Sequence, residues 1–303
     1  MINKKFVRLG LIGYGNRAAQ LGQIWAQDES DRCAIVAVAD NRPKRLEIAR
    51  EKHGSDIFTT TDYRELTKRS DVDAVAVLSP DFMHEQQAVA VLRAGKDLFC
   101  EKPLSISVES CDKILTEWQK SKRKFMMGFN LRYGNIYRVM KDMVDRKMIG
   151  DVKAAWVRHF VGTGSEWYYH HWMSVRKNVT SLLLQKASHD FDIIHWITGQ
   201  WTKKVSAFGS LDFFGGNKPN NLRCVNCKDR NCVERLTELW GMKKDTQCVF
   251  RKEVDVEDNS VVIMELENGI KASYQQCHFA PDYFRNYTFI GTEGRIEEVK
   301  TEP

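Results

Sequence analysis

The first half of the chain alternates short apolar runs with longer stretches in which apolar residues recur at helical spacing. The apolar runs show little polar alternation, which is typical of strands buried in a parallel sheet. They cover residues 7–13, 34–40, 73–79, 96–100 and 124–130, and the helical stretches cover residues 16–28, 43–53, 84–94 and 107–122. This order predicts a doubly wound α/β sheet, whose ligands bind outside the carboxyl ends of the strands.

The second half of the chain has a different pattern. After a helix within residues 181–199, strands are expected over residues 203–212, 260–266, 270–277, 285–290 and 295–299, with a hairpin turn at residues 267–269. Their alternation suits a sheet with one face on helices and the other open to a partner, so we expect a homodimer or homotetramer through this sheet. The change of pattern predicts two domains, residues 1–128 and 129–303.

Composition places the chain among folded globular proteins. A length of 303 residues suits about two domains, and with 43% hydrophobic residues each can bury a core. The net charge of +6 is scattered, and the basic run at residues 120–124 falls between a predicted helix and strand, where it indicates a solvated helix end. The N-terminus lacks the features of a secretory signal, and no apolar stretch approaches membrane-spanning length. We therefore expect a cytoplasmic protein with no nucleic-acid or membrane partner.

The first predicted strand leads directly into a glycine-containing turn and then a helix. The turn consists of Gly13, Tyr14, Gly15, Asn16, Arg17 and Ala18, and it fits the G-x-G-x-x-A pattern of dinucleotide-binding sheets. In this pattern the first glycine permits the tight turn, the second lets backbone approach a pyrophosphate, and the small third residue allows close helix packing. Because free N–H groups at the helix start favour negative charge, residues 13–17 are predicted to bind a dinucleotide.

The second predicted strand ends in Asp40, close to the spacing of about 20 residues expected for the acid that binds the adenosine ribose. A carboxylate accepts hydrogen bonds from ribose hydroxyls and repels a 2′-phosphate, which favours NAD over NADP. Arg42, Lys44 and Arg45 follow closely and could pair with that phosphate, so NADP remains an alternative. Three residues at the end of the run 73–79 and just beyond it are also expected to line the cofactor: Ser79, Pro80 and His84.

Five segments carry a family resemblance: LGLIGYGNRA, VAVAD, SPDFMHEQQAVAVLRAGKDLFCEKPLS, GFNLRY and KASHDFDIIHWITG. Together they resemble the glucose–fructose oxidoreductase and inositol dehydrogenase family, often written Gfo/Idh/MocA, over nearly the whole chain. The resemblance implies a Rossmann domain followed by an α+β domain with a large, mostly antiparallel sheet. It also implies hydride transfer between NAD or NADP and a hydroxyl-bearing carbon of a sugar, inositol or related polyol. The sequence ends at Pro303, soon after residues 291–297, whereas family members usually continue with more strand and helix. We therefore expect a short member or a shortened chain.

Lys102 follows the predicted strand at residues 96–100, at the edge of the sheet where ligands bind. Oxidising a secondary alcohol needs a base for the hydroxyl proton while hydride leaves the carbon. A lysine can be that base when burial and a nearby nicotinamide cation favour its neutral amine. We therefore predict Lys102 as the catalytic base, or the acid in the reverse direction; the alternative is an ordinary surface lysine. The resemblance implies a cis peptide before Pro103, and Glu101 is expected to be an orienting or cofactor-side partner.

The helix expected within residues 181–199 places His189, Asp192 and Trp196 on one stripe, while Asp190 points elsewhere. The resemblance implies that His189 faces the substrate and assists proton transfer. The alternative is a histidine satisfied within the core. Asp192 is expected to be a structural hydrogen-bond partner.

Further residues are expected to line the substrate pocket. Many family members have an aspartate four residues before the histidine, where this chain has Gln185, followed by Lys186. A glutamine can hydrogen-bond a sugar hydroxyl but cannot accept its proton. Residues 164–178 are expected to form a long loop over the site, with Trp167, His170, His171 and Trp172 exposed to it. The predicted substrate residues are Asn130, Arg132, Tyr133, Trp172, Gln185 and Lys186.

Four of the eight cysteines lie in a Cys-rich loop expected at residues 223–249: Cys224, Cys227, Cys232 and Cys248. A C-x-x-C pair followed by two further cysteines can hold a tetrahedral zinc ion, and similar insertions occur in some family members. The long interval between Cys232 and Cys248 leaves free thiols or an iron–sulfur cluster as alternatives. Such a zinc site would be structural, because four thiolates leave no open coordination position.

Three functional classes fit these patterns. The first is a dehydrogenase of sugars or polyols. The second is a glycoside hydrolase that keeps bound NAD and oxidises its substrate only transiently. The third is a non-catalytic sensor of NAD or sugar on the same fold, against which the presence of Lys102 and His189 argues.

Overall fold

The computed structural model describes residues 6–26, 32–239, 242–243 and 245–302. The chain divides into two compact units, residues 1–128 and 129–303. In the described ranges, no helix is both long and apolar enough to cross a membrane.

The first unit is built on a six-stranded parallel sheet with the strand order β3-β2-β1-β4-β5-β6. Its strands are β1 (Val7–Ile12), β2 (Cys33–Ala39), β3 (Phe58–Thr60), β4 (Ala74–Val77), β5 (Asp97–Cys100) and β6 (Phe125–Met127). Its helices are α1 (Asn16–Ala26), α2 (Pro43–His53), α3 (Tyr63–Thr67), α4 (His84–Arg93) and α5 (Val108–Ser121), with a 3-10 turn η1 (Asp81–Met83). The strand order reverses between β1 and β4, and such a switch point forms the ligand crevice of doubly wound sheets.

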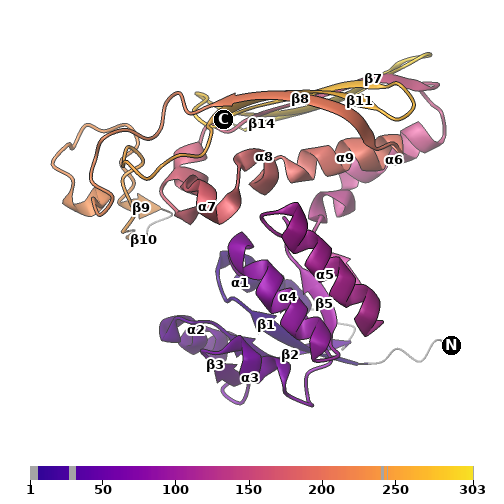
Figure 1. Cartoon of the computed structure of the whole chain (residues 1–303). Helices are drawn as coiled ribbons and strands as arrows, with labels where there is room; N and C mark the ends of the chain where they lie inside the picture. The colour runs from indigo at the N-terminus through magenta and orange to yellow at the C-terminus, as the bar shows by residue number, and fades with distance from the viewer. Residues whose placement is uncertain (1–5, 27–31, 240–241, 244, 303) are drawn as a thin grey trace. The chain divides into compact units, whose positions relative to one another are not determined.

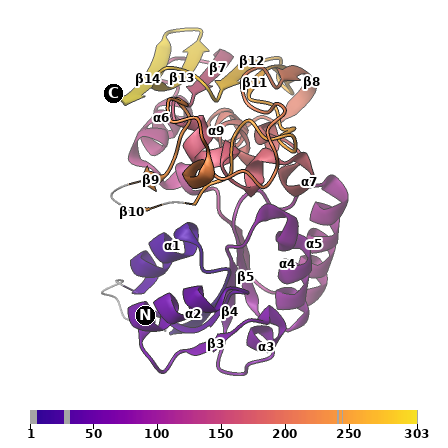
Figure 2. The ribbon, with the colours of Figure 1, turned by 90° about the vertical axis from the view of Figure 1, so that its left-hand side faces the viewer.

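Both faces of this sheet are covered, which explains the continuous apolar character of its strands. Helices α1 and α2 lie on one face and α4 and α5 on the other (Figure 2). Leu11 belongs to the core beneath α1 and α2, whereas its neighbour Ile12 belongs to the core beneath α4 and α5. Consecutive residues of β1 are therefore buried on opposite faces, and the predicted Rossmann-type α/β architecture is confirmed.

The second unit contains a six-stranded sheet with the order β14-β13-β7-β12-β11-β8. Its strands are β7 (Val152–Phe160), β8 (Thr202–Ser210), β11 (Asn259–Leu266), β12 (Lys271–Cys277), β13 (Tyr283–Gly291) and β14 (Arg295–Glu302). Its helices are α6 (Asn135–Asp145), α7 (Arg176–Val179), α8 (Leu182–Gln185) and α9 (Ser188–Thr198). Short elements are η2 (Asn130–Tyr133), η3 (Ser165–Tyr169), η4 (Trp172–Ser174), η5 (Cys224–Asn226), β9 (Glu238–Leu239) and β10 (Met242–Lys243). Only β7 and β12 pair in parallel, so the predicted mostly antiparallel sheet is confirmed.

The helices of the second unit cover one face of its sheet (Figure 1). Beneath α6 and α9, strand residues such as Tyr274, Tyr287 and Phe289 are fully buried in a single apolar core. Apolar side chains remain on the other face, where Phe208 is 73% exposed and Ile263 is 57% exposed. This alternation of buried and exposed positions is the pattern that predicted the strands.

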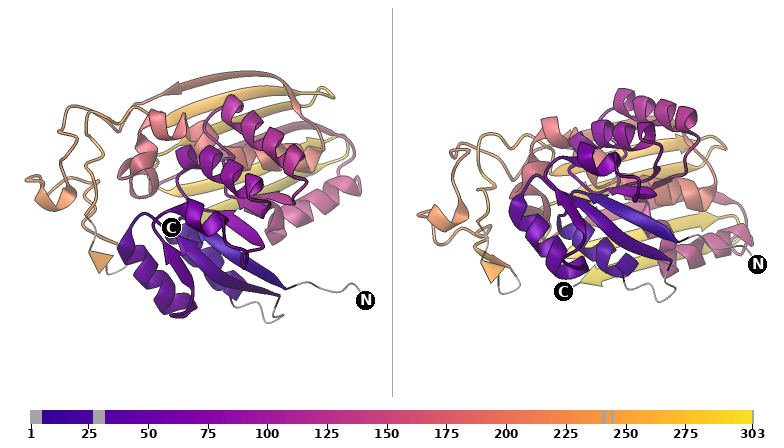
Figure 3. Two further views of the ribbon diagram at one scale, coloured as in Figure 1. Left: turned by 60° about the horizontal axis from the view of Figure 1, so that its bottom comes forward. Right: turned by 90° about the horizontal axis from the view of Figure 1, so that it is seen from below.

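Several elements differ from the prediction. The prediction missed strand β7 and helix α6. Helix α6 is amphipathic and buries Tyr137 and Met140, and β7 largely alternates buried and more exposed positions, so both elements carried a usable period. The expected helix within residues 181–199 is two helices, α8 and α9, which separate after Gln185. Residues 164–178 are not a loop, because they form the short helical segments η3, η4 and α7. The cysteine-rich segment is a long excursion from the sheet, drawn in orange in Figure 3.

Candidate active site

The glycine turn of the first unit closely approaches the end of β4. Gly13 has a φ of +86°, and a Cβ added to it would lie 2.8 Å from the backbone N and Cα of Ser79. Only glycine adopts this positive φ and allows this close approach of the Ser79 backbone without strain. The turn leads directly into α1, whose first N–H groups are available to an anion. This arrangement fits a dinucleotide pyrophosphate.

Tyr14 contributes to the turn through its backbone. Its N–H donates to Asp40 Oδ2 at 2.7 Å, while its ring packs edge-on against His53 and its hydroxyl lies 2.8 Å from His53 Nε2. Burial raises the pKa of Tyr14, and burial together with the nearby Lys52 lowers the pKa of His53. The contact therefore joins neutral groups, and it ties the glycine turn to the end of α2.

Glu101 connects the glycine turn to the segment that carries Lys102. Its Oε1 accepts a hydrogen bond from Arg17 Nε at 2.5 Å, and its Oε2 accepts one from the backbone N–H of Lys102 at 2.8 Å. Lys102 is partly buried directly after β5, and the implied cis peptide before Pro103 is confirmed. Both carboxylate oxygens of Glu101 are thus engaged in orienting its neighbours.

His84 is fully buried beneath the same segment, although it was predicted to line the cofactor. Its Nδ1 lies 2.8 Å from the carbonyl oxygen of Pro103, and its Nε2 lies 2.9 Å from that of Ser79. Burial lowers the pKa of His84, and these two carbonyls oppose that effect. The ring therefore links the end of β4 to the Lys102-Pro103 turn. Ser79 and Pro80 are partly exposed.

In the second unit, His189 lies in the first turn of α9, beside an ion pair that fixes the helix. Arg132 of η2 donates from Nε to Asp192 Oδ2 at 2.8 Å and from Nη2 to Asp192 Oδ1 at 2.5 Å. The same guanidinium lies 5.8 Å from the centroid of the Phe129 ring, which contacts His189 edge-on. Asp192 is thus a hydrogen-bond partner, and Arg132 anchors η2 to α9.

Asp190 lies on the other side of α9 and is held by a buried polar network. Its carboxylate accepts hydrogen bonds from Arg285 Nε at 3.1 Å and Nη2 at 2.5 Å, and from the Tyr287 hydroxyl, and it lies 3.3 Å from His159 Nδ1. Burial acts to raise the pKa of Asp190, but the Arg285 charge and the hydrogen bonds from His159 and Tyr287 hold it well below its usual value. The sequence did not reveal this network, because its members come from three separate elements, α9, β7 and β13.

The other predicted substrate residues differ in accessibility. Asn130 and Tyr133 are exposed, Trp172 and Lys186 are partly buried, and Gln185 is buried. Trp167 and His171 are exposed to solvent. His170 is an exception to the prediction, because it is 2% exposed and its Nδ1 lies 2.6 Å from the carbonyl oxygen of Gln247.

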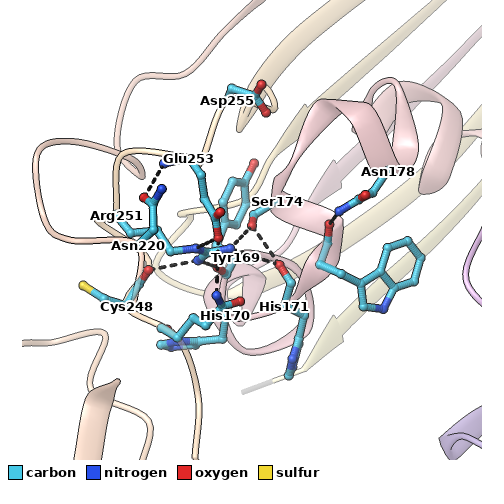
Figure 4. A network of polar contacts seen from close by, with 12 residues as sticks. Tyr169, His170, His171, Ser174, Asn178, Asn220, Cys248, Arg251, Glu253 and Asp255 are labelled. Carbon is cyan, nitrogen blue, oxygen red and sulfur yellow. Dashed lines mark hydrogen bonds and ion pairs between the residues drawn. The ribbon is translucent and has the colours of Figure 1, made fainter. Parts of the chain in front are cut away.

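A buried arginine joins the segment around His170 to the cysteine-rich excursion (Figure 4). Arg251 is 0% exposed and donates from Nη1 to the carbonyl oxygens of Tyr169 at 2.8 Å and Cys248 at 2.9 Å. Its Nη2 donates to Ser174 Oγ at 2.6 Å, and its Nε donates to Glu253 at 2.7 Å. The guanidinium therefore satisfies the carbonyl at the last residue of η3, and it also binds the Ser174 hydroxyl of η4.

The predicted metal ligands Cys224, Cys227, Cys232 and Cys248 line one small cavity of about 20 Å³. Across the described ranges, no group of three or more His, Cys, Asp and Glu side chains is arranged to hold a metal ion. All eight cysteines are free thiols. Burial acts to raise the pKa of Cys224, but hydrogen bonds with His170, the Leu236 backbone and Thr246 lower it to about 7. The zinc prediction is thus not supported.

A Rossmann-type unit with a dinucleotide cradle, followed by a unit with a mixed, largely antiparallel sheet, defines a class of nicotinamide-dependent oxidoreductases. A family model described as "Oxidoreductase family, NAD-binding Rossmann fold" matches residues 7–129, and one described as "GFO/IDH/MocA C-terminal domain" matches residues 137–297. The chain belongs to the GFO/IDH/MocA oxidoreductase family.

Curated relatives and solved structures agree with this assignment. The chain is 26% identical over 299 residues to YteT of Bacillus subtilis, provisionally named an oxidoreductase, covering 87% of this chain and 69% of that protein. It is 30% identical over 207 residues to the myo-inositol 2-dehydrogenase of Thermotoga maritima, covering 68% of this chain and 59% of the enzyme. The fold is similar to scyllo-inositol dehydrogenase of Lactobacillus casei with bound NAD(H) and scyllo-inositol, with a TM-score of 0.75, 22% identity, and coverage of 97% and 76%. The chain spans about half of several other relatives, such as inositol 2-dehydrogenases of Salmonella at 49%.

Buried histidines make the stability of this fold dependent on pH. Burial, aided by the charges of Lys186 and Arg285, lowers the pKa of His159 to about 3, and burial lowers that of His278 well below its usual value. Unfolded histidines protonate near pH 6.5, whereas these remain neutral in the folded protein. The contribution of these neutral histidines to the free energy of unfolding is therefore fully present above about pH 6.5. It is lost as pH decreases towards 3, by about 1.4 kcal/mol per pH unit for each histidine.

Urea unfolding at a series of pH values measures this loss. His278→Gln is expected to reduce the slope of the free energy of unfolding against pH by about the equivalent of one proton, because glutamine cannot take up the proton that an unfolded histidine binds. Neither ring nitrogen of His278 has a hydrogen-bond partner in the described ranges, so the substitution breaks no such bond. His171→Gln is the control, since His171 is exposed and its substitution should leave the slope unchanged. An unchanged slope in the His278 variant would contradict the assignment.

Proposed function

We propose that this chain is an NAD(P)-dependent dehydrogenase that transfers hydride between the nicotinamide and a hydroxyl-bearing carbon of a sugar, inositol or related polyol. The observation that carries the proposal is the linkage through Glu101, which joins Arg17 of the dinucleotide turn to the backbone of Lys102. This linkage fixes the backbone of Lys102, a partly buried residue at the carboxyl end of β5, on the ligand edge of the sheet. The names of the relatives add the polyol class.

Lys102 is proposed to move the substrate proton. The bound coenzyme supplies the hydride acceptor. Lys102 accepts the hydroxyl proton of the substrate when its amine is neutral, and it returns a proton in the reverse direction. Glu101 binds the backbone N–H of Lys102 and His84 contacts the carbonyl oxygen of Pro103, so together they fix the backbone from which this side chain extends.

His189 is proposed to assist proton transfer from the second unit. The Arg132–Asp192 pair and the Phe129 ring hold η2 against the turn that carries His189. Because Arg132 is committed to Asp192, we assign it a positioning role. Direct contacts with substrate hydroxyls are assigned to the remaining pocket residues, namely Asn130, Tyr133, Trp172, Gln185 and Lys186.

Incubation of the purified chain with NAD and a panel of sugars, inositols and sugar acids tests the proposal. Accumulation of NADH with one class of polyol supports a dehydrogenase. Release of an aglycone from a glycoside without net NADH would replace it with the transient-oxidation hydrolase. Binding of NAD and a sugar with no turnover of any substrate would replace it with the sensor.

The open face of the second sheet is proposed to bind a second copy of the chain. Phe208 of β8 pairs with Val261 of β11, and both belong to the face that no helix of the described ranges covers. These apolar side chains are exposed in the single chain, which favours an apolar partner surface. Sedimentation velocity of the full chain is expected to show a dimer or tetramer. A monomer at micromolar concentration would contradict this proposal.

A further inference from the structure

The end of β2 carries a carboxylate and several cations close together. Asp40 is 7% exposed, and Arg45 Nη1 lies 3.3 Å from its Oδ2. Arg42 contacts the same carboxylate through its backbone N–H, which donates to Oδ1 at 2.9 Å. Arg42 and Lys44 are exposed, whereas Arg45 is partly buried. Arg45 is therefore the cation of this group whose side chain reaches Asp40.

The guanidinium of Arg45 also lies against the glycine turn. A Cβ added to Gly15 would lie 3.5 Å from Arg45 Nη1 and 3.9 Å from Arg45 Cζ. Arg45 belongs to α2, and the contact between Tyr14 and His53 ties the end of that helix to the same turn. The guanidinium consequently lies between the acid that binds the adenosine ribose and the turn that binds the pyrophosphate.

The hydrogen bonds of Asp40 leave little capacity for a ribose. Its Oδ2 accepts from Tyr14 N–H and from Arg45, and its Oδ1 accepts from Arg42 N–H. A carboxylate offers about four acceptor positions, so roughly one is left, whereas a ribose diol donates up to two hydrogen bonds. Binding both hydroxyls therefore requires Arg45 to release Oδ2.

Release of Arg45 has a low energetic cost. The contact is single and long at 3.3 Å, and the Arg45 side chain is 36% exposed, so solvent screens it. While the contact is kept, it offsets part of the charge by which Asp40 would repel a 2′-phosphate, and it leaves other guanidinium N–H groups able to bind that phosphate.

We propose that Arg45 determines coenzyme specificity because its side chain takes one of two positions, depending on which coenzyme is bound. With NAD it withdraws and leaves Asp40 to the ribose diol, and with NADP it stays beside Asp40 and binds the 2′-phosphate. The chain consequently accepts both coenzymes. This inference rests on the proposed function, and it goes further by assigning the selection between coenzymes to one side chain.

Titration of the full chain with NADH and with NADPH, followed by coenzyme fluorescence without substrate, tests the inference. Wild type is expected to bind both coenzymes. Arg45→Met is expected to weaken NADPH binding by about tenfold to a hundredfold, the effect of losing one hydrogen bond to a charged group, and to leave NADH binding within about threefold. Asp40→Ala is expected to weaken NADH more than NADPH, because the diol loses its acceptor.

Arg50→Met is the matched control. Arg50 is an exposed arginine of the same helix whose side chain bonds Thr59, and its loss should weaken neither coenzyme. Equal weakening of NADH and NADPH by Arg45→Met, no weakening of NADPH, or wild-type binding of NADH alone would each overturn the inference while leaving the proposed function intact. Binding of neither coenzyme by wild type would overturn the proposed function itself.

Discussion

Replacing Lys102 by alanine is expected to lower kcat by about a hundredfold to ten-thousandfold, the usual contribution of a general acid or base. The affinity for NADH should stay nearly unchanged, because the dinucleotide turn and Asp40 lie on other elements of the sheet. Steady-state kinetics with the polyol identified from the panel, together with fluorescence titration of NADH, measures both quantities. Small primary amines added to the buffer are expected to restore part of the lost turnover.

The rescue by amines distinguishes a missing proton acceptor from a misfolded site. Lys120→Ala is the matched control, since Lys120 is an exposed lysine of α5 and its removal should leave kcat unchanged. Full turnover in the Lys102 variant would refute its role as the base. A loss of turnover accompanied by an equal loss of NADH affinity would instead assign Lys102 to coenzyme binding.

Replacing Asp190 by asparagine is expected to lower the free energy of unfolding by about 3–5 kcal/mol, because it leaves the Arg285 guanidinium buried without its counter-charge. The side chain of Asp190 is 0% exposed and that of Arg285 is 8% exposed, so solvent cannot replace the lost partner. Urea unfolding at neutral pH measures the change. Removing both charges, in Asp190→Asn with Arg285→Met, is expected to recover part of the loss.

Asp151→Asn is the control for this pair. Asp151 forms an ion pair with Lys147 at 2.9 Å, but both side chains are more than 60% exposed. Its replacement is expected to change the free energy of unfolding by no more than about 1 kcal/mol. A similarly small change in the Asp190 variant, or a double variant less stable than the sum of the single ones, would contradict a stabilising buried pair.

Local signals were sufficient for most of the fold. The continuous apolar strands and the glycine turn at residues 13–18 predicted the parallel sheet, and α2 begins and ends at the predicted residues 43 and 53. The same signals placed Lys102 directly after β5 and His189 on a helix. Each of these features depends on residues that are close in sequence, where periodicity and turn chemistry act directly.

Other features depend on contacts between distant residues. Burial of His84 and His170, which were expected at accessible positions, follows from their bonds to Pro103, Ser79 and Gln247. Strand β3 has only three residues and shows no usable period, so its pairing with β2 identifies it. The four cysteines gather at one cavity, as their spacing suggested, yet their arrangement gives zinc no support.

By itself, the sequence determined the class of fold, the dinucleotide turn and the position of a lysine at the ligand edge of the sheet, because local backbone preferences and apolar periodicity encode them. Only the tertiary structure decided which charges meet: Arg45 with Asp40, Arg17 with Glu101, and Arg285 with Asp190. An arginine side chain can reach many partners, and the selection among them depends on burial and on hydrogen-bond geometry across elements that are far apart in the chain.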